Sequence, residues 1–300
     1  MLFFVERKYN LLVMKKPLKM PFFALAFRKK IITPDTKTMF LGFVLFLLSF
    51  SPSYSQADNA WWIGLDATWK KYFTEKIGFG GQPTAKDLAA ISSLKKIDCN
   101  GLSLSNLEPI RKLKNVEIVW CDQNKITSLE PLSALPNLKE LDCSGNPVTD
   151  LDPLRNLKNL NKLIIFDTQV SNLSPLSGLR KLLVLDFSGC SNITNITPLK
   201  YIKSLEVLYC SRTKISNIDA LGELSSLKEL NFSETKVSNI ASLEKLTKLR
   251  EVVFANTMVT SVMPLKNSPQ LAVVYCADSK IKEAEANALK KILPNCEVIY

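Results

Sequence analysis

LKELDCSGNPVTDLDPLRNL, residues 138–157, is the stretch that decides the fold. It begins like a strand with one buried side, and it then turns back through a short proline-containing segment. The same pattern recurs every 22 residues, apart from one interval of 23 residues between Leu182 and Leu205. The units start at Leu94, Val116, Leu138, Leu160, Leu182, Leu205, Leu227, Leu249 and Leu271. Nine units in register predict a solenoid, because a fixed period of this length is the signature of a stacked repeat.

The apolar columns of the repeat explain why the units must stack. The residue three positions after each anchor is always apolar, and the one two positions further on is Cys, Ile or Phe. One unit buries about seven apolar side chains, roughly 10 to 20 kcal/mol, against an ordering cost on the order of 30 kcal/mol. A single unit therefore cannot fold alone, whereas stacked units share continuous core columns and parallel strand hydrogen bonds.

The repeat resembles the 22-residue leucine-rich repeat of bacterial internalins, also used by a regulatory subunit of protein phosphatase 1, with the consensus LxxLxLxxNxIxxLxPLxxL. This resemblance implies an α/β solenoid: a right-handed coil with a parallel sheet on the concave face and short helical turns on the convex face. A helical cap is expected at the N-terminal end, and a helix plus a strand at the C-terminal end. The consensus Asn stands at Asn124 and Asn146 and becomes Thr or Ser in later units, which we interpret as a structural variant. The resemblance says little about a particular ligand.

Charge and hydropathy divide the chain into five segments. Residues 1–55 hold nine Lys or Arg and two acidic residues, so most of the net charge of +11 lies there. The apolar run Met39–Phe50 is short for a membrane span and leads to small residues, which predicts a signal peptide cleaved near Gln56. The predicted segments are a basic extension (1–38), the signal-peptide core and cleavage region (39–56), a helical cap (57–93), leucine-rich repeats (94–281) and a C-terminal cap (282–300).

Export is the localisation that these segments predict. We expect a secreted or periplasmic protein of the cell envelope, monomeric, and attached to a membrane only if the N-terminal segment is not cleaved. Unlike internalins, the chain shows no immunoglobulin-like segment after the repeats, so a soluble protein is expected rather than a surface adhesin. Nucleic acid is a disfavoured partner, because residues 56–300 are close to charge balance with 30 basic and 26 acidic residues.

The two caps are predicted from helical patterns outside the repeats. We expect helices over Trp61–Gly78, Lys86–Leu94 and Lys282–Ile292, and a last strand over Cys296–Tyr300. Trp61, Trp62 and Trp69 are interpreted as core of the N-terminal cap rather than as ligand contacts.

Residue types argue against catalysis and against bound metal or cofactor. The chain has no histidine, which excludes Ser-His-Asp and Cys-His machinery. It has no phosphate-binding glycine loop and no CxxC pair, so we expect no enzyme, no cofactor and no metal site. Five of the seven cysteines share one inward column with Ile and Phe and are interpreted as small buried hydrophobic residues, with one bridged pair as the alternative.

The exposed side of the strands is the candidate binding site. Strand side chains alternate, so the residue four positions after each anchor faces outward, and this column mixes acids with large apolar residues. Nine strands spaced ~4.8 Å apart give a surface about 40 Å long, which is large enough for a protein interface. The candidate ligand-binding residues are Trp120, Asp142, Ile164, Phe166, Asp186, Tyr209, Val253 and Tyr275. We expect an unidentified protein as the partner; glycan or cell-envelope binding and a purely structural scaffold role remain alternatives.

Overall fold

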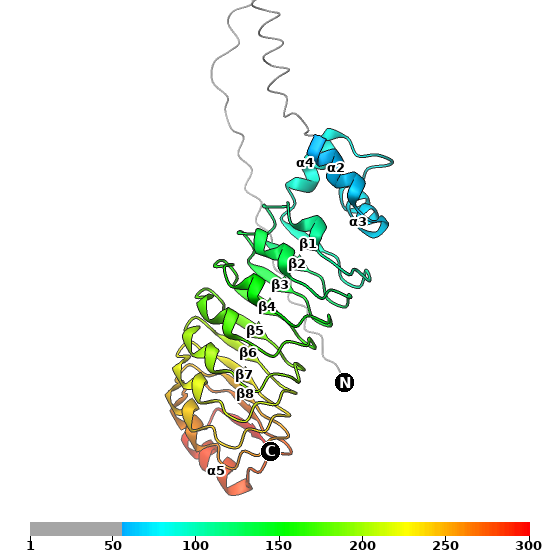
Figure 1. Cartoon of the computed structure of the whole chain (residues 1–300). Coiled ribbons are helices and arrows are strands. Elements are labelled where there is room, and N and C mark those ends of the chain that lie inside the picture. Colours follow the sequence, from blue (N-terminus) through cyan, green and yellow to red (C-terminus); the bar gives the residue numbers. More distant parts are fainter. Residues whose placement is uncertain (1–55) are drawn as a thin grey trace, which may run out of the picture. The chain divides into compact units, whose positions relative to one another are not determined.

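The computed structural model describes residues 56–300. The predicted basic extension and signal-peptide region, residues 1–38 and 39–55, lie outside the described residues. Ten parallel strands form a single open sheet in chain order, and a short 3-10 turn (η) follows almost every strand (Figure 1). The predicted solenoid fold is therefore confirmed.

Each strand is three residues long, with one strand in each repeat and a tenth in the C-terminal cap. The strands are β1 (Lys96–Asp98), β2 (Ile118–Trp120), β3 (Glu140–Asp142), β4 (Lys162–Ile164), β5 (Val184–Asp186), β6 (Val207–Tyr209), β7 (Glu229–Asn231), β8 (Glu251–Val253), β9 (Val273–Tyr275) and β10 (Glu297–Ile299). The turns are η1 (Glu108–Ile110), η2 (Glu130–Ala134), η3 (Asp152–Leu154), η4 (Ser174–Gly178), η5 (Thr197–Tyr201), η6 (Asp219–Glu223), η7 (Ala241–Lys245) and η8 (Met263–Asn267).

Strand register follows the repeat in every coil. The middle residue of each strand is buried and pairs with its equivalent in the next coil, as Leu141 does with Leu163. The 23-residue unit keeps this register, because Asp186 still pairs with Tyr209. Its extra residue lies in the turn after β5, where the Cys190 Sγ donates to the Ile165 carbonyl at 3.1 Å. The insertion thus leaves the sheet undisturbed.

The chain leaves each strand through a residue in the left-handed conformation. Non-glycine residues with positive φ recur at this position, and in other coils it is a glycine. The backbone N–H of this residue donates to a carbonyl of the following coil, as from Asp167 to Ser188 at 2.9 Å and from Arg212 to Ser233 at 2.9 Å. The unfavourable φ is offset by one additional hydrogen bond between neighbouring coils.

Buried Asn and Thr side chains support the next turn of the coil. Asn146 is 2% exposed; its amide donates to the carbonyls of Cys121, Cys143 and Ser144 at 2.9 to 3.1 Å, and its oxygen accepts from the Ile126 N–H at 2.9 Å. Thr213, at the equivalent position of a later coil, donates its hydroxyl to the Cys210 carbonyl at 2.9 Å. Asn146 therefore joins adjacent coils, whereas the Thr213 hydroxyl serves its own coil.

The N-terminal cap consists of three helices, α2 (Gln56–Gly64), α3 (Ala67–Ile77) and α4 (Ala85–Ser92). The prediction of one continuous helix over Trp61–Gly78 is wrong, because Asp66 begins a new helix by accepting from the Trp69 N–H at 2.9 Å. Gly78 ends α3 in the left-handed conformation, φ 82°, which glycine adopts without strain.

Aromatic side chains fill this cap and seal the first coil. Trp62 and Trp69 are buried, as predicted, and Trp61 is half-buried. The Tyr72 hydroxyl accepts from the Asp98 N–H at 2.9 Å, at the edge of β1 that has no strand beside it. Burial raises the pKa of Tyr72 to about 12. The cap therefore covers both the apolar end and one backbone donor of the sheet edge.

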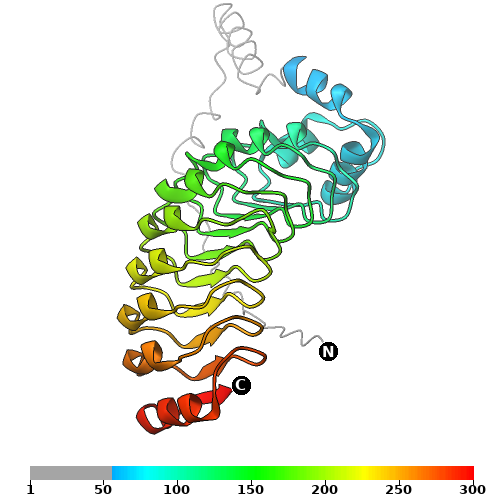
Figure 2. The same ribbon diagram turned by 60° about the horizontal axis from the view of Figure 1, so that its bottom comes forward.

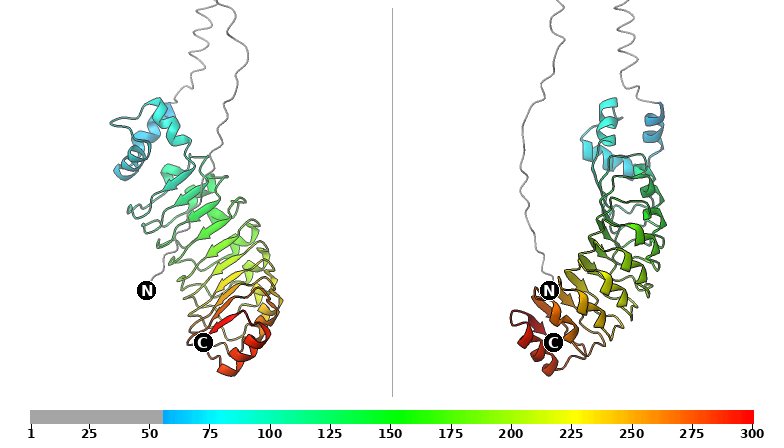
Figure 3. Two further views of the ribbon diagram at one scale, coloured as in Figure 1. Left: turned by 180° about the vertical axis from the view of Figure 1, so that it is seen from behind. Right: turned by 90° about the vertical axis from the view of Figure 1, so that its left-hand side faces the viewer.

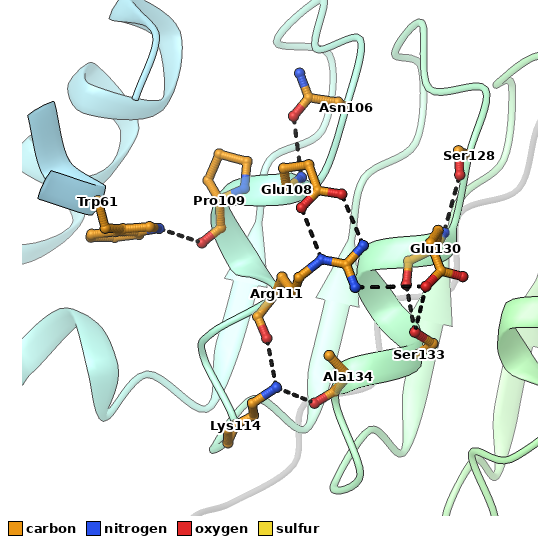
Figure 4. Close-up of polar contacts among 10 residues, drawn as sticks. All are labelled: Trp61, Asn106, Glu108, Pro109, Arg111, Lys114, Ser128, Glu130, Ser133 and Ala134. Atoms are coloured by element: carbon orange, nitrogen blue, oxygen red, sulfur yellow. Dashed lines mark hydrogen bonds and ion pairs between the residues drawn. The ribbon is translucent and has the colours of Figure 1, made fainter. Parts of the chain in front are cut away.

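Polar contacts join the cap to the first turns (Figure 4). The Trp61 Nε1 donates to the Pro109 carbonyl at 3.2 Å. The Arg111 guanidinium binds Glu108 in its own turn at 2.8 Å and reaches Glu130 of the next turn at 3.6 Å. Lys114 donates to the carbonyls of Arg111 and Ala134, both at 2.9 Å, and so satisfies the ends of two successive turns.

Helix α5 (Glu283–Ile292) and strand β10 close the other end, with β10 paired to β9. All seven cysteines are buried and unpaired, so the alternative of a bridged pair is not what the structure shows. Among residues 56–300, no helix has the length and apolar character needed to cross a membrane. The same residues contain no cluster of three or more potential metal ligands.

Candidate protein-interaction face

The outward-facing residues of the sheet form what we call the strand face: the residues two, four and six positions after each repeat anchor. The sheet lines the inner side of the curved stack and the η turns line its outer side (Figures 1 and 2), and the strands follow one another as a continuous band when seen from behind (Figure 3, left). All eight predicted binding residues lie on this face; seven are half-buried, and Tyr275 is 39% exposed.

The strand face is acidic, although the chain as a whole is basic. From β1 to β9 it carries seven carboxylates and two lysines. Both lysines are already engaged: Lys96 binds Asp98 at 3.1 Å and Lys162 binds Glu140 at 3.0 Å. The negative charge that remains is therefore not neutralised within the face.

Trp120 is held in a polar network near the N-terminal end of the face. Its indole Nε1 donates to Glu140 at 2.8 Å, and the Lys96 ammonium lies 3.2 Å from the ring centroid. A cation–π contact and a hydrogen bond fix the ring in place and cover one of its surfaces. Trp120 therefore offers less free surface to a ligand than its size suggests.

Asp142 and Asp186 have a structural role in addition to any contact with a ligand. The Asp142 Oδ1 accepts from the Ser144 N–H at 3.1 Å, and the Asp186 Oδ1 accepts from the Ser188 N–H at 2.8 Å. Asn231 does the same for Ser233 at 2.9 Å. Burial raises the pKa of Asp186, because desolvation disfavours its charged form.

Four of the predicted residues meet around a hollow of about 310 Å³ in the C-terminal half of the face. They are Phe166, Asp186, Tyr209 and Val253; Trp120, Asp142, Ile164 and Tyr275 lie on the same face but do not line the hollow. The remaining lining residues are Ser188, Ser211, Glu229, Leu230, Asn231 and Glu251. The structure therefore concentrates the candidate site into a smaller region than the sequence pattern indicated.

Tyr209 is one of the two aromatic residues that line the hollow. Its hydroxyl donates to Glu229 at 2.8 Å. Its pKa is raised well above that of a free tyrosine, first by burial and then by Glu229, Glu251 and Asp186. Tyr209 is thus a neutral, hydrogen-bonded aromatic wall at neutral pH.

Glu229 and Glu251 are the functional candidates that sequence reasoning missed. They lie two positions after their anchors, in an outward column that contributes none of the predicted binding residues. They are direct neighbours in the sheet, since Glu229 pairs with Glu251 in the register of β7 and β8. Two glutamates one repeat apart in an outward column were the signal in the sequence.

Arg212 lies beside one of the aromatic residues that line the hollow. Its guanidinium lies 5.0 Å from the centroid of the Phe166 ring and 3.4 Å from the Asp167 carboxylate. It follows β6 at the left-handed turn position and interacts with Asp186 through its charge, but it is not itself one of the lining residues.

Comparison with known proteins agrees with this architecture. A family model described as leucine-rich repeats in two copies matches residues 114–156, 136–167 and 203–245. An internalin C2 from Listeria monocytogenes is 28% identical, covers 71% of this chain and 93% of its own, and superposes with a TM-score of 0.64. A leucine-rich-repeat protein of Leptospira interrogans is 23% identical over 72% of this chain and 57% of its own, with a TM-score of 0.65. A search of curated protein sequences gave no significant match.

Proposed function

Because the chain is a leucine-rich-repeat protein similar to internalins, we propose that it binds a protein partner through its strand face. Leucine-rich-repeat proteins of this type act in protein–protein interaction. The proposal includes export to the periplasm or the medium, for which the predicted signal peptide of residues 39–56 is the support. It also includes a monomeric state and the segment boundaries given above.

The hollow in the strand face is the observation that carries this proposal. It combines two aromatic rings, a valine and carboxylates on a rigid sheet, and interfaces commonly use such a mixture of aromatic anchors and polar groups. The anchors are fixed by neighbouring strands, so a partner loses little binding energy in ordering them. Recognition rather than catalysis is favoured, because the chain has no histidine to act as a general base.

A capture experiment with matched variants tests the proposal. The full chain is immobilised and exposed to envelope and culture-medium extracts, and retained proteins are identified by mass spectrometry. Tyr209→Ala removes one of the two aromatic rings that line the hollow. Tyr201→Ala is the control, because this tyrosine is 57% exposed on η5, on the turn side of the stack. We expect a protein that wild type and Tyr201→Ala retain and that Tyr209→Ala loses.

Two results would contradict the proposal. If all three proteins retain the same set, the strand face is not the binding surface. If a glycan array shows saturable binding that is lost only in Tyr209→Ala, and no protein is captured, the face recognises carbohydrate instead. Circular dichroism melts of the variants show whether a loss of capture comes from unfolding.

A further inference from the structure

We propose that the hollow of the strand face binds the cationic side chain of a basic segment in the partner, with arginine as the best fit. This inference rests on the proposed protein-binding function and names the chemistry of the partner. It is carried by a cavity with an aromatic wall, by the carboxylates that line it, and by the lack of an ion pair at Glu229 and Glu251 among residues 56–300.

None of the three carboxylates that line the hollow forms a salt bridge within the described residues, although Arg212 interacts with Asp186 through its charge. Glu229 accepts the Tyr209 hydroxyl, and neither Glu229 nor Glu251 forms an ion pair among residues 56–300. The bases beside them in sequence are occupied elsewhere: Lys228 binds Glu206 at 2.5 Å and Arg250 donates to Gln270 at 3.4 Å. From β5 to β9 the strand face holds acidic residues and no basic one.

The placement of these two glutamates makes a cation favourable between them. They are direct neighbours on parallel strands, so their backbones lie about 4.8 Å apart. Like charges opposite each other across strands are destabilising. A positive group that lies between them removes this repulsion and gains two charge-assisted hydrogen bonds.

The walls of the hollow suit an arginine better than a small inorganic cation. Tyr209 and Val253 offer apolar surface for a methylene stem, and carboxylates line the same hollow. A guanidinium stacks on aromatic rings, and the chain already contains this geometry where Arg212 lies 5.0 Å from the Phe166 ring. No group of three or more metal ligands is present in the described part of the chain, which favours an organic cation.

A pair of peptides that differ only in charge tests this inference. The probes are a fluorescein-labelled peptide with the sequence Gly-Arg-Gly-Arg-Gly-Arg-Gly-Gly and its twin with citrulline, the neutral isostere, in place of every arginine. Binding to the full chain is followed by fluorescence anisotropy at low and at physiological salt. We expect the arginine peptide to bind at least about tenfold more tightly than the citrulline peptide, because a guanidinium has a charge that the carboxylates neutralise.

Three variants locate the binding site. Glu229→Gln and Glu251→Gln each should weaken the arginine peptide by about three- to tenfold, the range that one charge-assisted contact provides. Asp122→Asn is the matched control, because it removes a carboxylate from the same face, six positions after its anchor, but outside the hollow. This control should leave affinity within about twofold of wild type.

The outcomes separate this inference from the proposed function. Equal binding of the two peptides, or an equal loss in Asp122→Asn and Glu229→Gln, overturns the cation site. A captured protein that Tyr209→Ala loses and Glu229→Gln retains also overturns it, while protein recognition by the strand face stands. Loss of the captured protein in both Glu→Gln variants, together with discrimination against citrulline, supports it.

Discussion

Asn146→Ala gives the most direct measure of what holds neighbouring coils together. The side chain is 2% exposed, and its amide group forms hydrogen bonds to the preceding coil in both directions. The amide nitrogen donates to the Cys121 carbonyl, and the amide oxygen accepts from the Ile126 N–H. Its two amide hydrogens and one oxygen support about three net hydrogen bonds, each contributing about 1 kcal/mol. We therefore expect Asn146→Ala to lower the free energy of unfolding by about 3 kcal/mol.

The chain contains its own control for this experiment. Thr213 occupies the equivalent position of a later coil and donates one hydrogen bond to the Cys210 carbonyl, so Thr213→Ala should cost about 1 kcal/mol. Asn146→Thr should keep the hydrogen bond within the coil and cost about 2 kcal/mol.

Urea unfolding followed by circular dichroism gives the free energies, and hydrogen exchange gives the local effect. The Ile126 amide should exchange faster in Asn146→Ala, because it loses its acceptor. Equal destabilisation by Asn146→Ala and Thr213→Ala would refute the argument that Asn146 joins coils and Thr213 does not.

Two further predictions follow from buried ionisable groups. Asp186→Asn should raise the melting temperature at pH 7 by about 1 to 3 °C. The pKa of Asp186 is raised, so its charged form costs stability that the neutral amide does not. The amide oxygen can still accept a hydrogen bond from the Ser188 N–H, as the Asn231 oxygen does from the Ser233 N–H. A carboxyl group with a raised pKa contributes stability that is present at low pH and lost as the pH rises. The difference in melting temperature between Asp186→Asn and wild type should therefore shrink as the pH falls into the range where carboxyl groups titrate. A difference that stays constant with pH would contradict this explanation. Native thiols should resist iodoacetamide, because burial raises the pKa of Cys99 to about 12 and of Cys276 to about 11, and mass spectrometry should find seven adducts only after unfolding in urea without reductant. Fewer than seven would reveal a bridge.

The architecture was predictable because every coil repeats the same physical solution. Leu141 and its equivalents have to be buried in a strand, and the 22-residue period alone places them in register. The cap was harder, since Asp66 interrupts a helical pattern that looks continuous when it is read from apolar spacing alone. A capping residue inside an amphipathic run outweighed the periodicity there.

The site was predictable only as a face. Alternation along each strand identified Phe166, Tyr209 and Val253 as outward-facing, but it could not show which of them share one hollow. That grouping depends on the curvature of the sheet and on side-chain rotamers. Glu229 and Glu251 were missed because a charged residue on a surface strand usually has no special role, and their lack of a basic neighbour is visible only in three dimensions.

The constant strand register fixes the spacing between side chains on different coils, and deleting whole repeats would change this spacing in known steps. Trp120 on β2 and Tyr209 on β6 stand a fixed number of strands apart, and each coil contributes one step of about 4.8 Å. Deleting one complete 22-residue unit between them would bring the two side chains one step closer while each coil still meets an equivalent coil above and below. A partner that spans both positions would lose affinity for such a shortened protein. A partner that occupies only the hollow would bind it as before. The length of the stack can therefore be used to measure the size of the partner that it recognises.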